Sequence, residues 1–150
     1  MNIIPVTNPT GEIVELEWLR RAEGVHRQLR PHLPADYVGR MKEVFASGAE
    51  MSICVSGDKV CGIAVYRIIE KTFSGREMYC DDLVTAESDR STGVGHALME
   101  CMVDVAAARG CDYLALDSGC QRQQAHKFYF REGMMIPSFH FSKPIQKSAT

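Results

Sequence analysis

The sequence lacks the features that mark membrane, secreted and repeat proteins. No apolar run approaches the roughly 20 residues that a membrane-spanning helix requires. The stretch from Met1 to Leu16 has no basic region followed by an apolar one, so we expect no secretory signal. The chain also has no internal repeat and no low-complexity tract. We therefore expect a cytoplasmic protein that does not bind membranes.

The sequence has little excess of either charge. Lysine and arginine number 17 and aspartate and glutamate 19, which leaves a net charge of −2. A near-neutral chain has no electrostatic footprint for nucleic acid or for anionic lipid. With 150 residues, of which 45% are hydrophobic, the simplest expectation is one globular domain over residues 1–150.

The six cysteines do not form a metal-binding pattern. There is no CxxC pair, and no histidine stands at zinc-finger spacing from any of them, so we expect no metal. Most lie inside apolar runs, which predicts buried reduced thiols, whereas Cys120 follows a Ser-Gly turn and could be exposed. The six are Cys54, Cys61, Cys80, Cys101, Cys111 and Cys120.

Two local signals, the spacing of apolar residues and the turn residues, predict the secondary structure. Apolar residues at helical spacing predict helices over 16–29, 36–46, 94–109 and 121–133. β-branched runs predict a hairpin over 51–70 about a Ser-Gly-Asp turn, and strands over 78–85, 111–118 and 138–143. The segments 3–6 and 12–16 are two candidates for one further strand. This order predicts an α/β fold with a mixed sheet, antiparallel at first and parallel around the strand–helix–strand unit.

The segment RSTGVG places two glycines at the start of a long apolar helix. The first N–H groups of a helix are unpaired, and glycines ahead of them let several N–H groups converge on one anion such as a phosphate. The segment does not fit GxxxxGK[ST], and Leu98 stands where GxGxxG requires its third glycine, so neither nucleotide-binding motif applies. A plain strand-to-helix turn remains the alternative.

The same segment matches [QR]xxGx[GA] at every defined position and follows an acidic strand. In this the sequence resembles the GNAT superfamily of acyl-CoA-dependent N-acyltransferases, over roughly residues 51–134. The resemblance implies a GNAT fold in which backbone amides of this loop hold the pyrophosphate of CoA. The residues that match the cradle are Arg90, Ser91, Thr92, Gly93, Val94, Gly95 and His96.

A second motif lies in QRQQAHKFYFREGM. Ala125, Phe128-Tyr129 and Gly133-Met134 fit the AxxFYxxxGF pattern of the family, with methionine in the last place. The resemblance implies that Ala125 lets the cofactor approach and that Tyr129 is the general acid that protonates the departing CoA thiolate, which suits a phenol with a pKa near 10. The alternative is that both aromatic residues belong to the core.

Arg122 stands where relatives often have asparagine. Its spacing from Ala125 and Tyr129, three and seven residues, predicts one shared helix face. The departure leaves the contact with the pantetheine arm open, and Arg122 could instead meet a phosphate or an acidic partner.

The strand CDDLVT corresponds to the central strand of the family. The resemblance implies that main-chain groups of Leu83, Val84 and Thr85 bind the pantetheine amides and the thioester carbonyl. Side chains alternate along a strand, so we expect only one of Asp81 and Asp82 to face the substrate. Asp81 matches the carboxylate that points to the acceptor site in some relatives, so the resemblance makes it the preferred base or amine anchor and Asp82 the alternative. A carboxylate in a dry cleft can have a raised pKa, which suits a base.

Four further residues are weaker candidates for the acceptor side. His126 is either near the cofactor or a helix-surface residue, and His140 either lines the acceptor cleft or points outward. Glu77 and Tyr79 precede the acidic pair on the same strand.

Together these features predict an acetyl-CoA-dependent N-acetyltransferase that moves an acetyl group to a primary amine of a small molecule or peptide by direct attack. One alternative is a CoA-binding sensor without turnover. Another is an acyl-enzyme formed on Cys120 or Cys80. Homodimerisation is expected only as a tendency of the family.

Overall fold

The computed structural model describes residues 1–148, which form two compact units. The first unit, Met1–Leu116, contains a five-stranded sheet in the order β1-β2-β3-β4-β5, and the second unit begins at Asp117 and contains α4. The elements are β1 (Asn2–Pro5), α1 (Leu16–Leu29), α2 (Tyr37–Ala46), β2 (Ala49–Ser56), β3 (Lys59–Lys71), β4 (Gly75–Thr85), the 3-10 helix η1 (Glu87–Asp89), α3 (Val94–Ala108), β5 (Tyr113–Leu116) and α4 (Gln123–Arg131).

The sheet is mixed, as the element order predicted. Strands β1 to β4 pair antiparallel with their neighbours, and β4 pairs parallel with β5 through the crossover helix α3. The extra N-terminal strand is β1, so the 3–6 candidate is close to correct. The 12–16 candidate is not a strand and contributes only an isolated bridge between Thr7 and Ile13.

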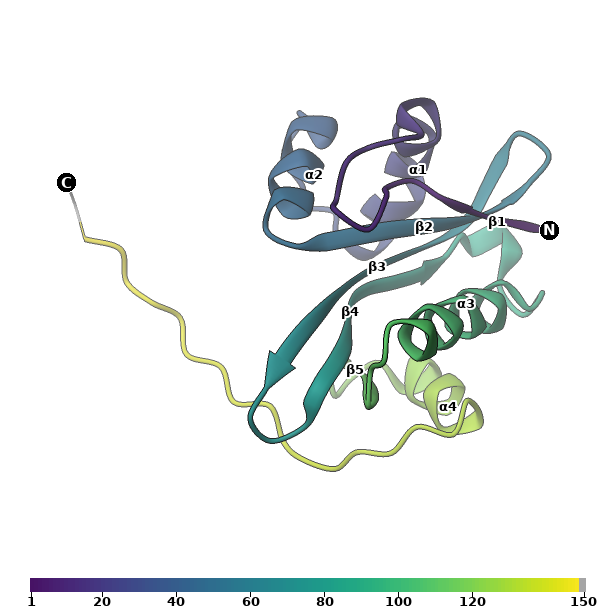
Figure 1. Ribbon diagram of the computed structural model, residues 1–150. Coiled ribbons are helices and arrows are strands. Elements are labelled where there is room, and N and C mark those ends of the chain that lie inside the picture. The colour runs from purple at the N-terminus through teal and green to yellow at the C-terminus, as the bar shows by residue number, and fades with distance from the viewer. Residues whose placement is uncertain (149–150) are drawn as a thin grey trace. The chain divides into compact units, whose positions relative to one another are not determined.

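Helices cover both faces of this sheet. Figure 1 shows α1 and α2 on one face and α3 on the other. Leu19, Met41 and Phe45 from the first layer pack on Ile53 and Ile63 of the sheet, and all five are buried. The start of α2 is capped because the Asp36 carboxylate accepts the Gly39 N–H at 3.0 Å.

The strand predicted over 138–143 is wrong. No strand forms there, and Phe139 and Phe141 are 86% and 93% exposed. Alternating apolar residues form a strand only where a partner strand satisfies the backbone N–H and C=O groups. The second unit, as far as it is described, contains no strand that could do so.

The cysteines agree in part with expectation. All six are free thiols, and Cys54, Cys61 and Cys80 are buried, whereas Cys101 and Cys111 are half-buried and Cys120 is exposed.

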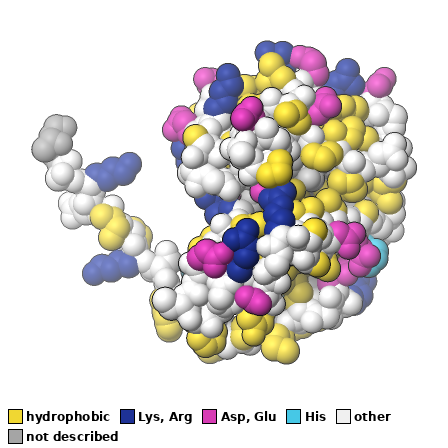
Figure 2. All heavy atoms as spheres, viewed as in Figure 1, with side chains coloured by type: hydrophobic (Ala, Val, Ile, Leu, Met, Phe, Trp, Pro, Cys, Tyr) yellow, Lys and Arg dark blue, Asp and Glu magenta, His cyan; other side chains and the backbone are white. Residues whose placement is uncertain are grey.

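None of the helices within residues 1–148 combines the length and apolarity needed to cross a bilayer. In Figure 2, basic and acidic side chains are interspersed on the visible face.

Candidate functional site

The strand β4 is longer than its partner β5. Their parallel pairing runs only from Glu77–Tyr113 to Cys80–Leu116, whereas β4 continues to Thr85 and stays paired with β3. On its β5 side, the backbone of β4 beyond Cys80 therefore extends past the end of the β4–β5 ladder. The predicted thioester-binding residues Leu83, Val84 and Thr85 lie in this segment.

A β-bulge interrupts β4 at the acidic pair. In the register with β3, Asp82 is opposite Val65 and Cys80 is opposite Tyr66, which leaves Asp81 as an extra residue. A bulge breaks the alternation of side chains. The expected alternation of Asp81 and Asp82 therefore does not hold, because both line the same pocket. That only one of them faces the substrate stays a prediction.

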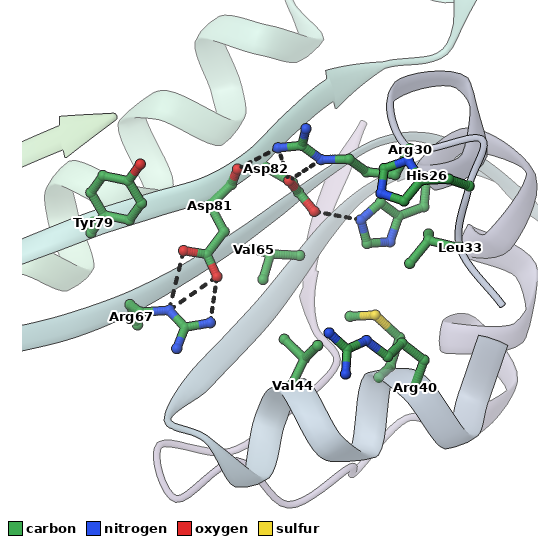
Figure 3. Close-up of a pocket in the computed structure, with 12 residues that line it drawn as sticks. His26, Arg30, Leu33, Arg40, Val44, Val65, Arg67, Tyr79, Asp81 and Asp82 are labelled. Carbon is green, nitrogen blue, oxygen red and sulfur yellow. Dashed lines mark hydrogen bonds and ion pairs between the residues drawn. The ribbon is translucent and has the colours of Figure 1, made fainter. Parts of the chain in front are cut away.

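This pocket, drawn in Figure 3, is our candidate for the site that binds the acceptor, and we name it the acceptor pocket. Its volume is about 400 Å³, and helices α1 and α2 with the segment between them form one wall, while β3 and β4 form the other. Its lining residues are His26, Arg30, His32, Leu33, Arg40, Met41, Val44, Val65, Arg67, Tyr79, Asp81 and Asp82.

Asp81 is held by a guanidinium group from the neighbouring strand. The Nε atom of Arg67 donates to both carboxylate oxygens at 3.1 and 3.0 Å, and its Nη2 atom donates to Oδ2 at 2.5 Å. Both side chains are about three-quarters buried, with 24% and 23% exposed. Asp81 is therefore an oriented carboxylate whose two oxygens are both already hydrogen-bonded.

Asp82 belongs to a hydrogen-bonded chain that links β4 to both helices of the covering layer. Its Oδ2 atom lies 2.6 Å from Nε2 of His26, whose Nδ1 atom lies 2.8 Å from the Tyr37 hydroxyl. Arg30 donates from Nε to Oδ1 at 2.8 Å and from Nη2 to the Asp81 carbonyl at 3.2 Å. Figure 3 shows that the side chains of His26, within α1, and Arg30, at the C-terminal end of α1, both reach Asp82.

The surroundings of Asp82 and Tyr37 shift the pKa values of both side chains. Burial raises the pKa of Asp82, but hydrogen bonds and charge from His26 and Arg30 outweigh burial, so the pKa lies below its usual range. The expectation that a carboxylate base in this cleft has a raised pKa is therefore wrong for Asp82. Burial raises the pKa of Tyr37, which stays a neutral phenol that can donate to His26.

The loop that matches the pyrophosphate cradle is strongly curled. Ser91 and Gly93 both have positive φ angles, of 64° and 91°, and a side chain at Gly93 would meet no atom within 4 Å. The first intrahelical bond of α3 joins the Ala97 N–H to the Gly93 carbonyl, so the N–H groups of Val94 and Gly95 precede the helical ladder. Successive N–H groups in such a turn form a concave anion site.

Thr92 and Lys59 both contact Asp89, which comes just before the loop. The Thr92 hydroxyl donates to the Asp89 carbonyl, and the Lys59 ammonium lies 2.8 Å from the Asp89 carboxylate. The hydrogen bond from Lys59 holds the pKa of Asp89 below its usual range. Arg90 is exposed, with its guanidinium 4.0 Å from Glu87.

In the second unit, α4 carries Ala125 and Tyr129, as predicted, but begins at Gln123. Arg122 is the N-cap residue of α4 and has a non-helical backbone. The expectation that Arg122 shares a helix face with Ala125 and Tyr129 is therefore wrong. The Phe128 and Tyr129 rings meet edge to face at 5.5 Å.

The weaker candidates have specific partners. Within the second unit, His126 lies 2.8 Å from the Gly119 carbonyl, and His140 lies 3.5 Å from Asp117. Glu77 is buried and binds Ser74 and Lys71 at 2.8 and 3.1 Å, which is a structural arrangement, whereas Tyr79 lines the acceptor pocket.

Sequence reasoning missed His26, Arg30, Tyr37 and Arg67. One signal was present for His26, which follows Leu19 by seven residues and Ala22 by four and so falls on the apolar face of its helix. A polar residue on such a face needs a buried partner, here Asp82. The partner lies 56 positions away, and no local pattern names it.

A family model described as Acetyltransferase (GNAT) family matches residues 12–134. The chain belongs to the GNAT family. The match covers both motifs and the whole of β4, so the family expected from RSTGVG and the α4 motif is confirmed, and with it the mixed-sheet fold.

One curated relative matches part of this GNAT chain. The "Uncharacterized N-acetyltransferase YhdJ" of Bacillus subtilis (strain 168) is 39% identical over 72 residues, which are 47% of this chain and 51% of the relative. The chain thus matches about half the length of that curated relative.

Two solved structures share the fold at low identity. One is AAC(6')-Iy in complex with a bisubstrate analog, CoA-S-monomethyl-acetylneamine, with a TM-score of 0.80, 17% identity, and coverage of 97% and 98% of the two chains. The other is ribosomal-protein-alanine N-acetyltransferase from Brucella melitensis biovar Abortus 2308, with a TM-score of 0.79, 14% identity, and coverage of 97% and 100%.

Among residues 1–148, no three histidine, cysteine, aspartate or glutamate side chains gather as metal ligands would.

Proposed function

We propose that this GNAT protein is an N-acetyltransferase that uses acetyl-CoA to acetylate a primary amine of a small molecule or peptide. The observation that carries the proposal is the segment of β4 beyond Cys80, whose backbone extends past the β4–β5 ladder and whose bulged residues line a pocket. One strand thus offers main-chain groups for a thioester at its edge and side chains for an amine on its face.

The Arg90–Gly95 loop and the His96 N–H would hold the pyrophosphate of the CoA substrate. Two positive φ angles and the open space around Gly93 suit an anion that is bound by backbone groups. Main-chain groups of Leu83, Val84 and Thr85 would bind the pantetheine amides and polarise the thioester carbonyl, because a backbone N–H that donates to that oxygen stabilises the charge developing there.

The amine would attack the acyl carbon directly. A C–N bond forms, the C–S bond breaks, the sulfur takes a proton, and the amine loses one. Both oxygens of Asp81 accept hydrogen bonds from Arg67, so we assign Asp81 as the amine anchor rather than the base. Asp82, with its low pKa, is also a poor base, and the amine proton would leave through water.

Tyr129 would give the sulfur its proton, as the α4 motif predicts. A phenol suits this step because it is protonated at neutral pH. Ala125 and Arg122 remain predicted contacts of the pantetheine arm or of a phosphate. A homodimer and a cytoplasmic location also stay predictions.

The test is a screen of amines with a thiol-detecting assay, followed by mass spectrometry of the products. Acetyl-CoA-dependent thiol release together with an acetylated amine supports the proposal. Acetyl-CoA binding without release from any amine favours the alternative, a sensor. An acetyl group found on the protein itself favours an acyl-enzyme on Cys120. Cys80 is a poor nucleophile, because burial raises the pKa of its thiol.

A further inference from the structure

The acceptor pocket contains two aspartates, yet it is not an acidic pocket. Asp81 is paired with Arg67 and Asp82 with Arg30, and Asp82 also lies within hydrogen-bond distance of the His26 ring. Both arginine–aspartate pairs are partly buried and make short charge-assisted hydrogen bonds. The carboxylates are therefore engaged by protein cations before any ligand arrives.

One further cation lines the pocket beyond these pairs. Arg40 of α2 is the third arginine among the lining residues, against two aspartates, and His32 adds an imidazole. The acid paired with Arg40 is Glu43, one turn further along the same helix at 3.4 Å, with 72% of its side chain exposed. An exposed helix pair of this kind contributes little and leaves the guanidinium available to a ligand.

The rest of the lining is apolar. Leu33 and Val44 are half-buried, and Val65 and Met41 are buried. Figure 3 shows the Arg40 guanidinium beside Val44 on the pocket side of α2, with Arg67 and Asp81 across the pocket on the strands. A ligand in this pocket would meet one oriented carboxylate, one surplus guanidinium and an apolar wall.

We propose that the acceptor is an amine that also carries a carboxylate, as a small apolar amino acid does. This inference rests on the proposed function and names the substrate class. Asp81 binds the amino group, Arg40 and the outer edge of Arg67 bind the carboxylate, and the apolar wall takes the side chain. A volume of about 400 Å³ suits a molecule of this size.

The competing class is a polyamine or another multiply cationic amine. Such a ligand would place a second positive charge near Arg40 without a free carboxylate to receive it. Like charges in a partly desolvated site are unfavourable, so the pocket selects against this class.

The experiment compares three amines that share one apolar group: L-leucine, L-leucinamide and 3-methylbutylamine. The first alone has a carboxylate. We expect kcat/KM for L-leucine to exceed the other two by about 10-fold or more, as one charge-assisted hydrogen-bonding pair provides. Arg40→Met should remove this preference.

The matched control is Arg20→Met, because Arg20 is an exposed helix arginine paired with a glutamate three residues away, as Arg40 is. It should keep the preference for L-leucine. Equal rates for the three amines, a preference for 3-methylbutylamine, or a preference unchanged in Arg40→Met would each overturn the inference.

Binding of the same three amines, followed by ligand-observed NMR, separates this inference from the proposed function. If no amine of the wider screen releases thiol, the proposed function fails, but selective binding of L-leucine that is lost in Arg40→Met still supports the carboxylate site. Binding of none of the three, or equal binding of all, contradicts it.

Discussion

The imidazole of His26 lies 2.6 Å from the carboxylate of Asp82 and 2.8 Å from the hydroxyl of Tyr37. These three residues come from α1, β4 and α2, so one chain of hydrogen bonds joins both covering helices to the strand that carries the candidate site. His26 and Tyr37 are buried, and water cannot replace either partner without opening the layer. The chain thereby positions the bulge and the wall of the acceptor pocket.

Replacing Asp82 with asparagine should lower the free energy of unfolding by roughly 3 kcal/mol at pH 7, because it removes one partner of a buried charged network. The folded-state pKa of Asp82 lies below its usual range. Its contribution is therefore complete above the unfolded pKa of about 4 and is lost as the pH falls toward the folded value.

Urea denaturation of the wild type and Asp82→Asn at pH 7 and pH 3 checks this, and the difference between them should shrink at pH 3. Asp58→Asn is the control, since the Asp58 side chain is fully exposed and should matter at neither pH. A difference that is the same at both pH values would show that the Asp82 charge is not responsible.

Replacing Asp81 with asparagine distinguishes an anchor from a base. As an anchor it should raise KM for the amine about 10-fold, while the pH dependence of kcat keeps its acidic limb, because the carboxylate does not take the proton in the transition state. Steady-state kinetics across pH measures both. A large fall in kcat with loss of the acidic limb would instead make Asp81 the base, and Asp104→Asn on the exposed side of α3 should change neither.

Replacing Tyr129 with phenylalanine should reduce kcat about 100-fold and leave KM for acetyl-CoA little changed, because only the proton donor to the thiolate is removed. Tyr113→Phe, at a tyrosine that is 62% exposed, should be neutral. Unchanged turnover in Tyr129→Phe would exclude Tyr129 as the general acid.

Replacing Gly62 with alanine should destabilise the first unit by about 1–3 kcal/mol, because it overpacks the contact between β3 and the start of α3. The new Cβ would lie 2.6 Å from Cγ1 of Val94 and 3.0 Å from Cδ1 of Leu98. It should also weaken acetyl-CoA binding, because Val94 belongs to the proposed cradle. Chemical denaturation tests the first effect, with Gly24→Ala as a control that should stabilise the exposed face of α1.

Local patterns were enough to predict most of the fold. Apolar periodicity placed α1 and α3, and the Ser-Gly-Asp turn placed the β2–β3 hairpin, because each depends on neighbours in the chain. The strand predicted over 138–143 was wrong for the opposite reason, because a strand depends on a partner strand that the local sequence does not identify. The RSTGVG and FY motifs identified the family from residues close together.

The acceptor pocket depended on contacts between distant residues. The bulge at Asp81 follows from the register of β4 on β3, which alternation alone cannot reveal. The pairs Arg67–Asp81 and His26–Asp82 join residues 14 and 56 positions apart. Together with Arg30, these partners occupy both carboxylates, so the pocket is not acidic although two aspartates line it.

Calorimetry of acetyl-CoA binding tests whether the RSTGVG loop of this GNAT protein holds the pyrophosphate of CoA. The proteins to compare are the wild type, a Gly93→Glu/Gly95→Glu double variant, and Gly57→Glu, which also replaces a positive-φ glycine with open space around it but lies in the β2–β3 turn. We expect micromolar binding by the wild type and Gly57→Glu, and a loss of about 100-fold or more in the double variant. No binding by the folded wild type, or equal binding by the double variant, would contradict this expectation.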